Sequence, residues 1–491
     1  MTKSTIIKVL FPYIYREFKQ TLLMLQSNNY DLENTPVAIN SYLCMSQKGT
    51  VEFTEETEIL FIVSFFQKNG NLEEALKAVT TGIKQFPYSV DLYIFKITLL
   101  IEQGQNDDVV LTYIDRALDL VPNSPRVLLL KAEVLANSEN FTEAESILDF
   151  IVTYADKNEL EQIYLLKAFI YDNQEQFDDM FDALKDALSI NPRNAEALTQ
   201  MWLAVAYSER YEDSIEVHEA ILDEDPYSFQ AWQNLGHAHN GLKNLEEAIF
   251  AYEYSTITNP DNEFGYLDWA LACSEANRYN EALEVYKEVE LRFGTNPELQ
   301  SKIGLCHQYM DNYLSASKYY AKALRADEQN HEAHYRMGEC LVIQNDYQNA
   351  IVAFKRAIMI KPQLEEYHLA LAKSYEESGD LENAKNAYDR LIEVAPECPE
   401  HWLYQVDFFC KIKNFAEALE TLEIAELNIS RNAYLLYHRA VCFFRMGNRN
   451  EAMHWLQEAL LEDYAMHSRI FTAVPNLEKD KDVLNLIRTF R

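Results

Sequence analysis

The chain has 491 residues, 48% of them apolar, and its 43 basic and 78 acidic residues give a formal net charge of −35 at pH 7. Such a charge repels phosphate backbones and anionic lipid, which argues against nucleic-acid binding and favours basic protein partners. The seven cysteines are scattered and form no CxxC pair, so we expect reduced thiols in the cytoplasm rather than a disulfide framework.

Residues 1–55 are expected to form an N-terminal helical cap. Apolar side chains recur there at three- and four-residue steps, as on one face of a helix: Ile7, Phe11, Ile14, Phe18, Leu22 and Leu25. We expect this helix to pack on the first repeat. A docking or membrane-surface helix is the alternative, because four basic residues face one acidic residue in this stretch: Lys3, Lys8, Arg16 and Lys19 against Glu17. No signal peptide or membrane span is expected, since no cleavage site or long uncharged apolar run follows.

A 34-residue period governs residues 56–463. Alanines followed four positions later by a bulky residue recur every 34 residues at Ala248, Ala282, Ala316, Ala350, Ala384, Ala418 and Ala452. Upstream, the same slot holds Ala75, Val110, Ala144, Met180 and Ser214, with gaps of 35, 34, 36 and 34 that indicate two small insertions. Twelve helical hairpins therefore run from about Glu56 to Asp463. With only 12 glycines in the chain, few of their turns are expected to need a left-handed glycine.

The slots within each hairpin have a recognisable pattern. The best-formed unit contains Trp232, Leu235, Gly236, His239, Ala248, Tyr252, Ser255 and Pro260. Prolines recur at the end slot, as Pro87, Pro122, Pro192, Pro226, Pro260, Pro362 and Pro396. Small residues at positions 8 and 20 of the 34-residue unit, here Gly236 and Ala248, let its two helices approach closely. The proline ends the second helix. Packing is expected to differ where Trp202, Met180 and Ser214 occupy these slots.

This pattern resembles the W-x2-L-G-x2-Y…A-x3-F…P signature of the tetratricopeptide-repeat family. The resemblance implies an all-α fold, a right-handed α-solenoid of about twelve 34-residue hairpins with helical caps, of the bacterial multi-repeat type. It also implies a non-enzymatic protein-binding scaffold or adaptor. The alternative is a substrate-recruiting subunit of an enzyme or co-chaperone complex.

Residues 464–491 are expected to form a C-terminal capping helix. Asn476 is placed to cap it after Pro475. Its apolar side is formed by Leu477, Val483, Leu484, Ile487 and Phe490.

No catalytic or metal-binding constellation is recognisable, and no cofactor is expected. The chain lacks GxGxxG, Walker and GxSxG motifs, and His331 and His334 are not at the spacing of a zinc-protease pair. Cys306, Cys340 and Cys442 all fall at position 10 of their units. Packing between helices explains them better than a metal row, because neighbouring helix axes lie about 8–10 Å apart.

The family resemblance implies that the first helices of the hairpins line a concave surface, where positions 2, 5 and 9 meet a ligand. Those slots contain two bases, Arg126 and Lys373. They contain eight acids: Glu133, Glu196, Glu298, Glu332, Glu339, Glu366, Glu400 and Asp407. Lys302 and Arg336 occupy position 6 and are interpreted as isolated, so no clamp for a terminal carboxylate is expected. Asn234 stands alone, without an asparagine ladder.

Three groups of residues form the candidate partner groove. Gln230, Gln233, His237 and Asn240 are candidates for hydrogen bonds to an extended backbone. Phe264, Leu267 and Leu271 form a candidate apolar anchor site. Glu332, Glu339, Glu366 and Glu376 are candidates for lysine or arginine recognition. The hypothesis is a protein or peptide segment with an apolar anchor followed by basic residues; the alternative is ordinary solvated surface.

Overall fold

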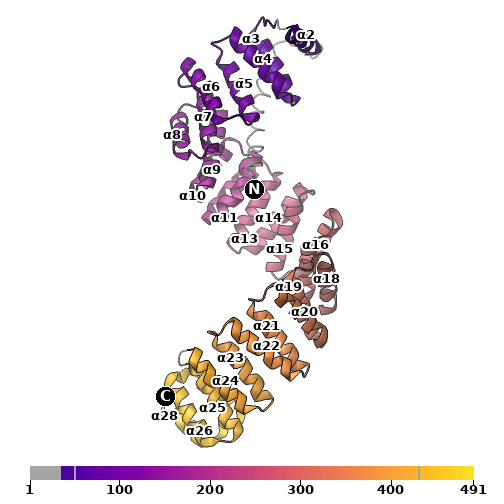
Figure 1. The fold of residues 1–491 in the computed structure, drawn as a ribbon, viewed down its shortest axis with the longest axis vertical. Coiled ribbons are helices and arrows are strands. Elements are labelled where there is room, and N and C mark those ends of the chain that lie inside the picture. Colours follow the sequence, from indigo (N-terminus) through magenta and orange to yellow (C-terminus); the bar gives the residue numbers. More distant parts are fainter. Residues whose placement is uncertain (1–34, 49–50, 430–431, 491) are drawn as a thin grey trace. The chain divides into compact units, whose positions relative to one another are not determined.

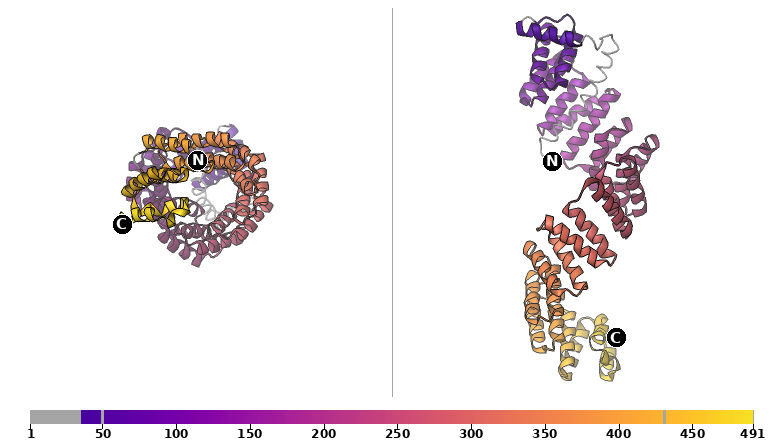
Figure 2. Two further views of the ribbon diagram at one scale, coloured as in Figure 1. Left: turned by 90° about the horizontal axis from the view of Figure 1, so that it is seen from below. Right: turned by 90° about the vertical axis from the view of Figure 1, so that its right-hand side faces the viewer.

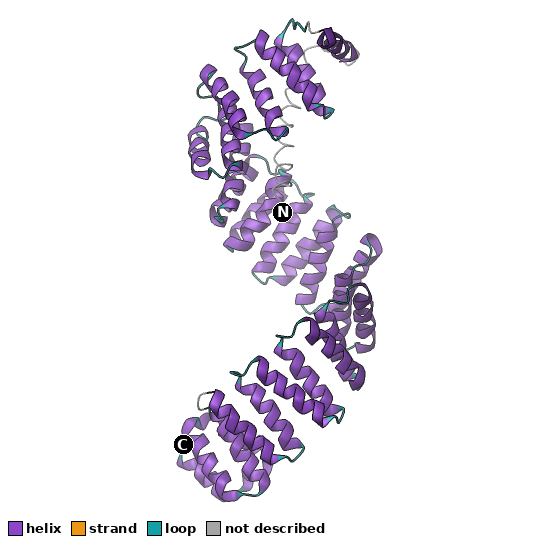
Figure 3. Cartoon of the chain, in the orientation of Figure 1, coloured by secondary structure: helices purple, strands orange, loops and turns teal. Residues whose placement is uncertain are grey.

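The computed structural model describes residues 35–48, 51–429 and 432–490. Within these ranges every regular element is a helix, as Figure 3 shows, which confirms the all-α prediction. The apolar residues between Ile7 and Leu25 lie outside the described residues. The chain divides into two compact units, residues 1–265 and 266–491.

The first unit contains α2 (Thr35–Lys48) and a series of stacked helical hairpins (Figure 1). The hairpins are α3 (Glu56–Lys68) with α4 (Leu72–Gln85), α5 (Val90–Glu102) with α6 (Asp107–Leu120), α7 (Pro125–Asn137) with α8 (Phe141–Ile151), α9 (Lys157–Asn173) with α10 (Phe177–Ile190), α11 (Ala195–Ser208) with α12 (Tyr211–Glu224), and α13 (Phe229–Gly241) with α14 (Leu245–Thr258).

The second unit begins within α15 (Glu263–Glu275), and its hairpins also lie side by side (Figure 2). They are α15 with α16 (Tyr279–Phe293), α17 (Pro297–Tyr309) with α18 (Tyr313–Ala326), α19 (His331–Ile343) with α20 (Tyr347–Ile360), α21 (Glu365–Glu377) with α22 (Leu381–Val394), α23 (Pro399–Lys411) with α24 (Phe415–Asn428), and α25 (Ala433–Met446) with α26 (Arg449–Glu462). The described residues thus contain the twelve hairpins that the period predicted.

The larger of the two predicted insertions alters the helices around it. The longer gap before Met180 coincides with a short α8 of 11 residues and a long α9 of 17 residues. Asp156 begins α9 with a capping box that includes Glu159, so this helix has its own start signal. The insertion is therefore absorbed by moving helix ends.

Small residues at position 8 bring the two helices of a hairpin together. A Cβ atom on Gly236 would lie 2.6 Å from the ring of Tyr252, and one on Gly338 would lie 2.5 Å from Phe354. These aromatic rings are fully buried. The glycine leaves the space that the ring fills, as the slot pattern predicted.

The turn inside each hairpin has the same backbone feature. A left-handed residue occurs in all twelve turns. Eight are not glycine: Glu139, Glu175, Glu209, Lys243, Asn277, Asp311, Asn345 and Lys413. Glycine occupies this position in only four turns, as Gly70, Gly104, Gly379 and Gly447, which agrees with the prediction that few turns need a left-handed glycine. The chain tolerates a strained conformation where the flanking helices determine the turn.

The C-terminal segment is more divided than expected. Two 3-10 turns, η1 (Tyr464–His467) and η2 (Pro475–Lys479), flank α27 (Ser468–Ala473), and α28 (Lys481–Thr489) follows. Asp480, not Asn476, caps α28 by accepting hydrogen bonds from the backbone N–H groups of Asp482 and Val483. Asn476 does not cap this helix because it lies inside η2. Val483 and Ile487 pack with the last hairpin.

Among the described helices, none combines the length and the apolar character that crossing a bilayer requires.

Candidate functional site

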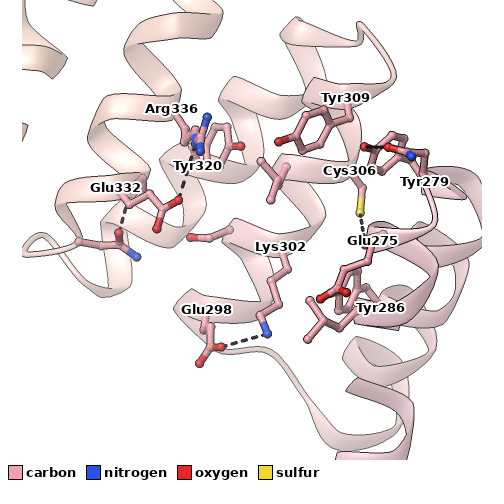
Figure 4. A pocket seen from close by; sticks show the side chains of 17 residues that line it. Glu275, Tyr279, Tyr286, Glu298, Lys302, Cys306, Tyr309, Tyr320, Glu332 and Arg336 are labelled. Atoms are coloured by element: carbon pink, nitrogen blue, oxygen red, sulfur yellow. Dashed lines mark hydrogen bonds and ion pairs between the residues drawn. The ribbon is translucent and has the colours of Figure 1, made fainter. Parts of the chain in front are cut away.

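The first helices of three successive hairpins surround a pocket in the second unit. Side chains of α15, α17 and α19 line it, together with tyrosines that precede or belong to α16 and α18 (Figure 4). Its volume is about 570 Å³. Two of the predicted partner residues, Leu271 and Glu332, are among its lining side chains. We call this cavity the inner pocket.

Charged residues of the inner pocket are paired with one another. Lys302 Nζ lies 3.1 Å from the carboxylate of Glu298, one helical turn away (Figure 4). Arg336 lies 3.2 Å from Glu339 and 3.7 Å from Glu332. Since Lys302 and Arg336 occupy the same slot of neighbouring hairpins, they line one cavity. The interpretation of these bases as isolated was therefore wrong.

Aromatic and apolar side chains form the rest of the pocket. The rings of Tyr279 and Tyr309 stack with centroids 4.8 Å apart, and Tyr309 is 54% exposed. Tyr320 is buried and donates a hydrogen bond of 2.8 Å to Gln308 Oε1. Burial raises the pKa of the hydroxyls of Tyr286 and Tyr320 above the ordinary range. These hydroxyls stay neutral, so the pocket offers hydrogen bonds and ring faces to a ligand.

The predicted polar residues on α13 belong to the first unit, and two of the four form hydrogen bonds within the chain. Gln233 Oε1 accepts a hydrogen bond of 2.9 Å from Asn262 Nδ2. His237 Nδ1 shares a hydrogen bond of 2.9 Å with the hydroxyl of Tyr252. Gln230 and Asn240 are half-buried, and Asn240 Oδ1 has no hydrogen-bond partner among the described residues.

The predicted apolar residues lie along α15. Phe264 is 72% exposed, Leu267 is half-buried and Leu271 is 41% exposed. Because only Leu271 of these three lines the inner pocket, it is the residue best placed to meet an apolar side chain there.

The predicted acidic residues fall into two classes. Glu339 accepts hydrogen bonds from Arg336 and Gln308, and Glu376 accepts them from Tyr388 and Lys411. Glu332 and Glu366 are exposed. Glu332 and Glu366 are therefore more accessible to a basic partner than Glu339 and Glu376.

The repeat assignment is supported by comparison with protein families. Residues 302–365 and 341–405 match two family models described as tetratricopeptide repeat, and residues 161–194 and 229–256 match a third. The chain is a multi-repeat tetratricopeptide-repeat protein. The resemblance predicted from the slot pattern is confirmed.

Individual relatives of this tetratricopeptide-repeat protein are distant. It is 25% identical over 150 residues to the mouse protein O-mannosyl-transferase TMTC1 and 24% identical over 164 residues to the human one. These matches cover 30% and 33% of the chain, but only 16% and 18% of those proteins. The chain therefore aligns with less than a fifth of each relative's length.

Solved structures show similar helical arrays. YrrB, described as a repeat protein with an unusual peptide-binding site, is 19% identical, with 37% of this chain and 94% of that chain covered and a TM-score of 0.33. A tetratricopeptide repeat protein from Parabacteroides merdae is 14% identical, with coverages of 54% and 98% and a TM-score of 0.37. The Cut9–Hcn1 complex is 12% identical, with coverages of 89% and 98% and a TM-score of 0.36. At such scores these structures do not guide the placement of a ligand.

The acidic slots of this tetratricopeptide-repeat protein do not contribute equally to its charge. Burial raises the pKa of Glu133 and of Glu196 to about 7, so both are partly protonated at neutral pH. Glu298, Glu366, Glu400 and Asp407 are exposed. Asn234 is buried and donates a hydrogen bond of 2.7 Å to the carbonyl oxygen of Leu198.

The departures from the slot pattern near Asn234 have a structural explanation. Trp202 at position 8 is too large to lie between the helices and is exposed. His218 takes the place of the usual aromatic residue, and its Nδ1 lies 2.7 Å from the carbonyl oxygen and 3.2 Å from the hydroxyl of Ser214. Asn234 Nδ2 lies 3.2 Å from His218 Nε2. A polar network thus replaces apolar packing, as the departures predicted.

The cysteines at position 10 are packing residues. Cys306, Cys340 and Cys442 are buried, and burial raises the pKa of the Cys340 thiol to about 12. In the part of the chain that the structure describes, no three His, Cys, Asp or Glu side chains are grouped as a metal site.

Proposed function

We propose that this chain is a protein-binding scaffold that holds an extended segment of a partner protein along its first helices, with one apolar side chain seated in the inner pocket. The observation that carries the proposal is the convergence of α15, α17 and α19 on a cavity of about 570 Å³. A cavity of this size accepts a single large side chain and has both apolar walls and paired polar groups.

The proposed segment has basic residues beside its apolar anchor. Glu332 at the pocket and Glu366 on the next hairpin are exposed carboxylates in equivalent slots. Lysine or arginine side chains of the segment would meet them, which would fix its direction along the array. We further propose a reducing, cytoplasmic setting, which is supported by the seven free cysteines.

The anchor is tested by affinity capture with the full-length chain and mass spectrometry. Leu271 and Leu305 both line the inner pocket, and we expect Leu271→Asp with Leu305→Asp to lose partners that the wild type captures. Leu291→Asp with Leu314→Asp is the control, because both residues are exposed leucines of second helices. An identical set of partners on the pocket variant and the wild type would rule out the inner pocket.

Basic recognition is tested separately on the captured partner. Glu332→Gln with Glu366→Gln should weaken binding about tenfold, if each exposed charge contact contributes about 0.7 kcal/mol, and should reduce its salt dependence. Glu382→Gln with Glu397→Gln changes the net charge equally at exposed positions of α22 and its following loop. Equal losses for the two pairs would show that only the overall charge matters.

A second proposal is that the scaffold recruits a substrate to an enzyme. It is supported by the similarity of about a third of the chain to part of two O-mannosyl-transferases. The same capture experiment distinguishes it: an enzyme should co-purify, and its turnover of a co-captured protein should depend on Leu271 and Leu305. Turnover that is independent of both residues would exclude it.

A further inference from the structure

A second groove lies on the opposite face of α13 from the predicted polar residues. Trp232, Leu235 and His239 line it from α13, and side chains of α12 and α14 form its two walls. At 100° per residue, Trp232 and His239 point away from Gln233 and His237. The groove has a volume of about 690 Å³ and lies entirely within the first unit. We call it the outer groove.

Aromatic rings form a platform along the outer groove. Trp232 and Phe250 lie edge to face with centroids 6.1 Å apart, and Tyr254 stacks obliquely on both, at 5.0 Å and 4.6 Å. The indole N–H of Trp232 donates a hydrogen bond of 2.9 Å to the carbonyl oxygen of Pro226, which holds the ring in place. Phe250 nevertheless remains 51% exposed. The platform is therefore held by the fold while the rings of Phe250 and Tyr254 remain exposed to solvent.

The walls of the outer groove are acidic. Glu219 and Asp223 are one helical turn apart on α12, and Glu246 and Glu247 begin α14. All four are exposed, and the groove's lining includes no lysine or arginine. The inner pocket, in contrast, has three acids and two bases among its lining residues.

We propose that the outer groove binds an arginine side chain of a partner protein. A cation above the ring of Phe250 is attracted by the ring's electron-rich face, and the flanking carboxylates add hydrogen bonds and charge. Arginine fits better than lysine because its guanidinium is planar, stacks on aromatic rings and is less strongly hydrated. This site adds to the scaffold function proposed above, but does not depend on the inner pocket.

The test uses the full-length chain labelled with 5-fluorotryptophan and observed by fluorine NMR. The protein has five tryptophans, and Trp232→Phe assigns the resonance of Trp232. The probe is a six-residue acetylated and amidated peptide with one central arginine among alanine and glycine. The matched probe has citrulline at the same position, which keeps the shape and removes the charge. We expect the arginine peptide to shift the Trp232 resonance and the citrulline peptide to leave it in place.

Matched variants separate the local site from overall charge. Glu219→Gln, Asp223→Asn and Glu247→Gln together should weaken the arginine-dependent shift at least tenfold. Glu420→Gln, Glu423→Gln and Glu451→Gln remove three exposed acids of the second unit and should leave the affinity within twofold. Phe250→Leu keeps an apolar side chain but removes the ring face, and should weaken binding about two- to fivefold, from about 0.5–1 kcal/mol for an exposed cation–π contact.

Three results would overturn the proposal. They are equal binding of the citrulline peptide, equal losses in the two triple variants, and stronger shifts of Trp232 by spermidine than by the peptide, which would assign the groove to free polyamines. Partner loss in the Leu271 and Leu305 variants reports on the inner pocket alone. If the arginine peptide does not shift the Trp232 resonance, the proposed scaffold function is unaffected. If the Leu271 and Leu305 variants lose no partners, the proposal for the outer groove is unaffected.

Discussion

The inner pocket and the outer groove show that one kind of hairpin can present two different surfaces. In the inner pocket, Lys302 and Arg336 are paired with acids one turn away, so most of its charge is compensated locally. The outer groove has four carboxylates on its walls and no base among its lining residues. A count of acidic slots along the sequence therefore does not show which of the acids have a base beside them.

The two surfaces also rest on different interiors. Next to the inner pocket, Gly304 and Gly338 leave room for the buried rings of Tyr320 and Phe354. Beside the outer groove, the buried side chains of His218 and Asn234 connect α12 to α13 by a hydrogen bond. We therefore expect the first surface to be sensitive to side-chain volume and the second to pH.

The largest predicted effect concerns His218. Burial lowers its pKa to about 4, whereas an unfolded histidine has a pKa of about 6.5. The unfolded state binds the extra proton between these values, so stability is full above pH 6.5 and is lost as the pH falls toward 4, by up to about 3 kcal/mol. Amide hydrogen exchange in α12 and α13 should show this loss. His218→Gln should remove the pH dependence, at a fixed cost in stability.

A matched control for His218 is His454→Gln, because His454 is exposed on α26. This variant should keep the wild-type pH profile of α12 and α13. An unchanged profile in His218→Gln would show that His218 does not connect pH to the outer groove.

Glu133 should show the opposite pH dependence with a similar size. Burial raises its pKa to about 7, above the ordinary pKa of 4.5 for an exposed glutamate. The folded state therefore binds the extra proton, so stability is full below about pH 4.5 and is lost as the pH rises to 7, by about 3 kcal/mol. Hydrogen exchange in α7 should show that Glu133→Gln removes this loss, whereas Glu143→Gln, at an exposed position of α8, retains it. A flat wild-type profile would contradict the assignment of Glu133 as an interior acid.

The fold was predictable because hairpin pairing is local and repeats every 34 residues. Ala248 and its equivalents were enough to locate the hairpins, since a small residue in that slot has the same neighbours in each of them. The turns were not predictable in the same way. Glu175 and Glu209 adopt a left-handed conformation that their residue type disfavours, because the packed helices on either side determine it.

The candidate site was predictable only in part. Leu271 and Glu332 were recognised from their slots, and both line the inner pocket. The 34-residue spacing of Lys302 and Arg336 was the signal that could have placed these two bases together. The outer groove was not predicted, because the slot pattern indicates only that Trp232 packs within its repeat. The groove also needs side chains from α12 and α14, the second helices of two successive hairpins. The exposure of a residue in one of these slots depends on the side chains around it, which the slot pattern does not include.

The next prediction tests how closely the inner pocket depends on volume. Gly338→Ala should destabilise α19 and α20 by about 2 kcal/mol, because the new Cβ would lie 2.5 Å from a buried ring. Gly304→Ala should cost less, about 1 kcal/mol, because its nearest contact would be 3.0 Å. Hydrogen exchange of the two hairpins measures both. Equal costs, or none, would show that these rings move aside freely.

A smaller effect is expected when the compensating bases are removed. Lys302→Gln with Arg336→Gln should change stability by less than about 1 kcal/mol, since the pairs are partly exposed. It should also make the inner pocket resemble the outer groove electrostatically. Calorimetric titration with the arginine peptide should then detect a second, weaker site. Lys318→Gln with Arg325→Gln, at exposed positions of α18, should not create one, and a second site in this control would attribute the gain to net charge.

The smallest effect concerns the turns that lead into the two surfaces. The turns around the inner pocket use Asn277 and Asp311, whose residue types tolerate a left-handed backbone, whereas the turn before α12 uses Glu209 with φ 57°. Glu209→Gly should stabilise α11 and α12 by about 0.5 kcal/mol, because relief of backbone strain of about 1–2 kcal/mol exceeds the added entropy of the unfolded chain. The reverse exchange, Gly379→Ala in the turn between α21 and α22, should destabilise that hairpin by a similar amount. A Cβ there meets nothing within 4 Å, so any cost arises from the backbone alone. Local hydrogen exchange measures both changes in stability. If Glu209→Gly and Gly379→Ala change stability in the same direction, the left-handed turns are not strained.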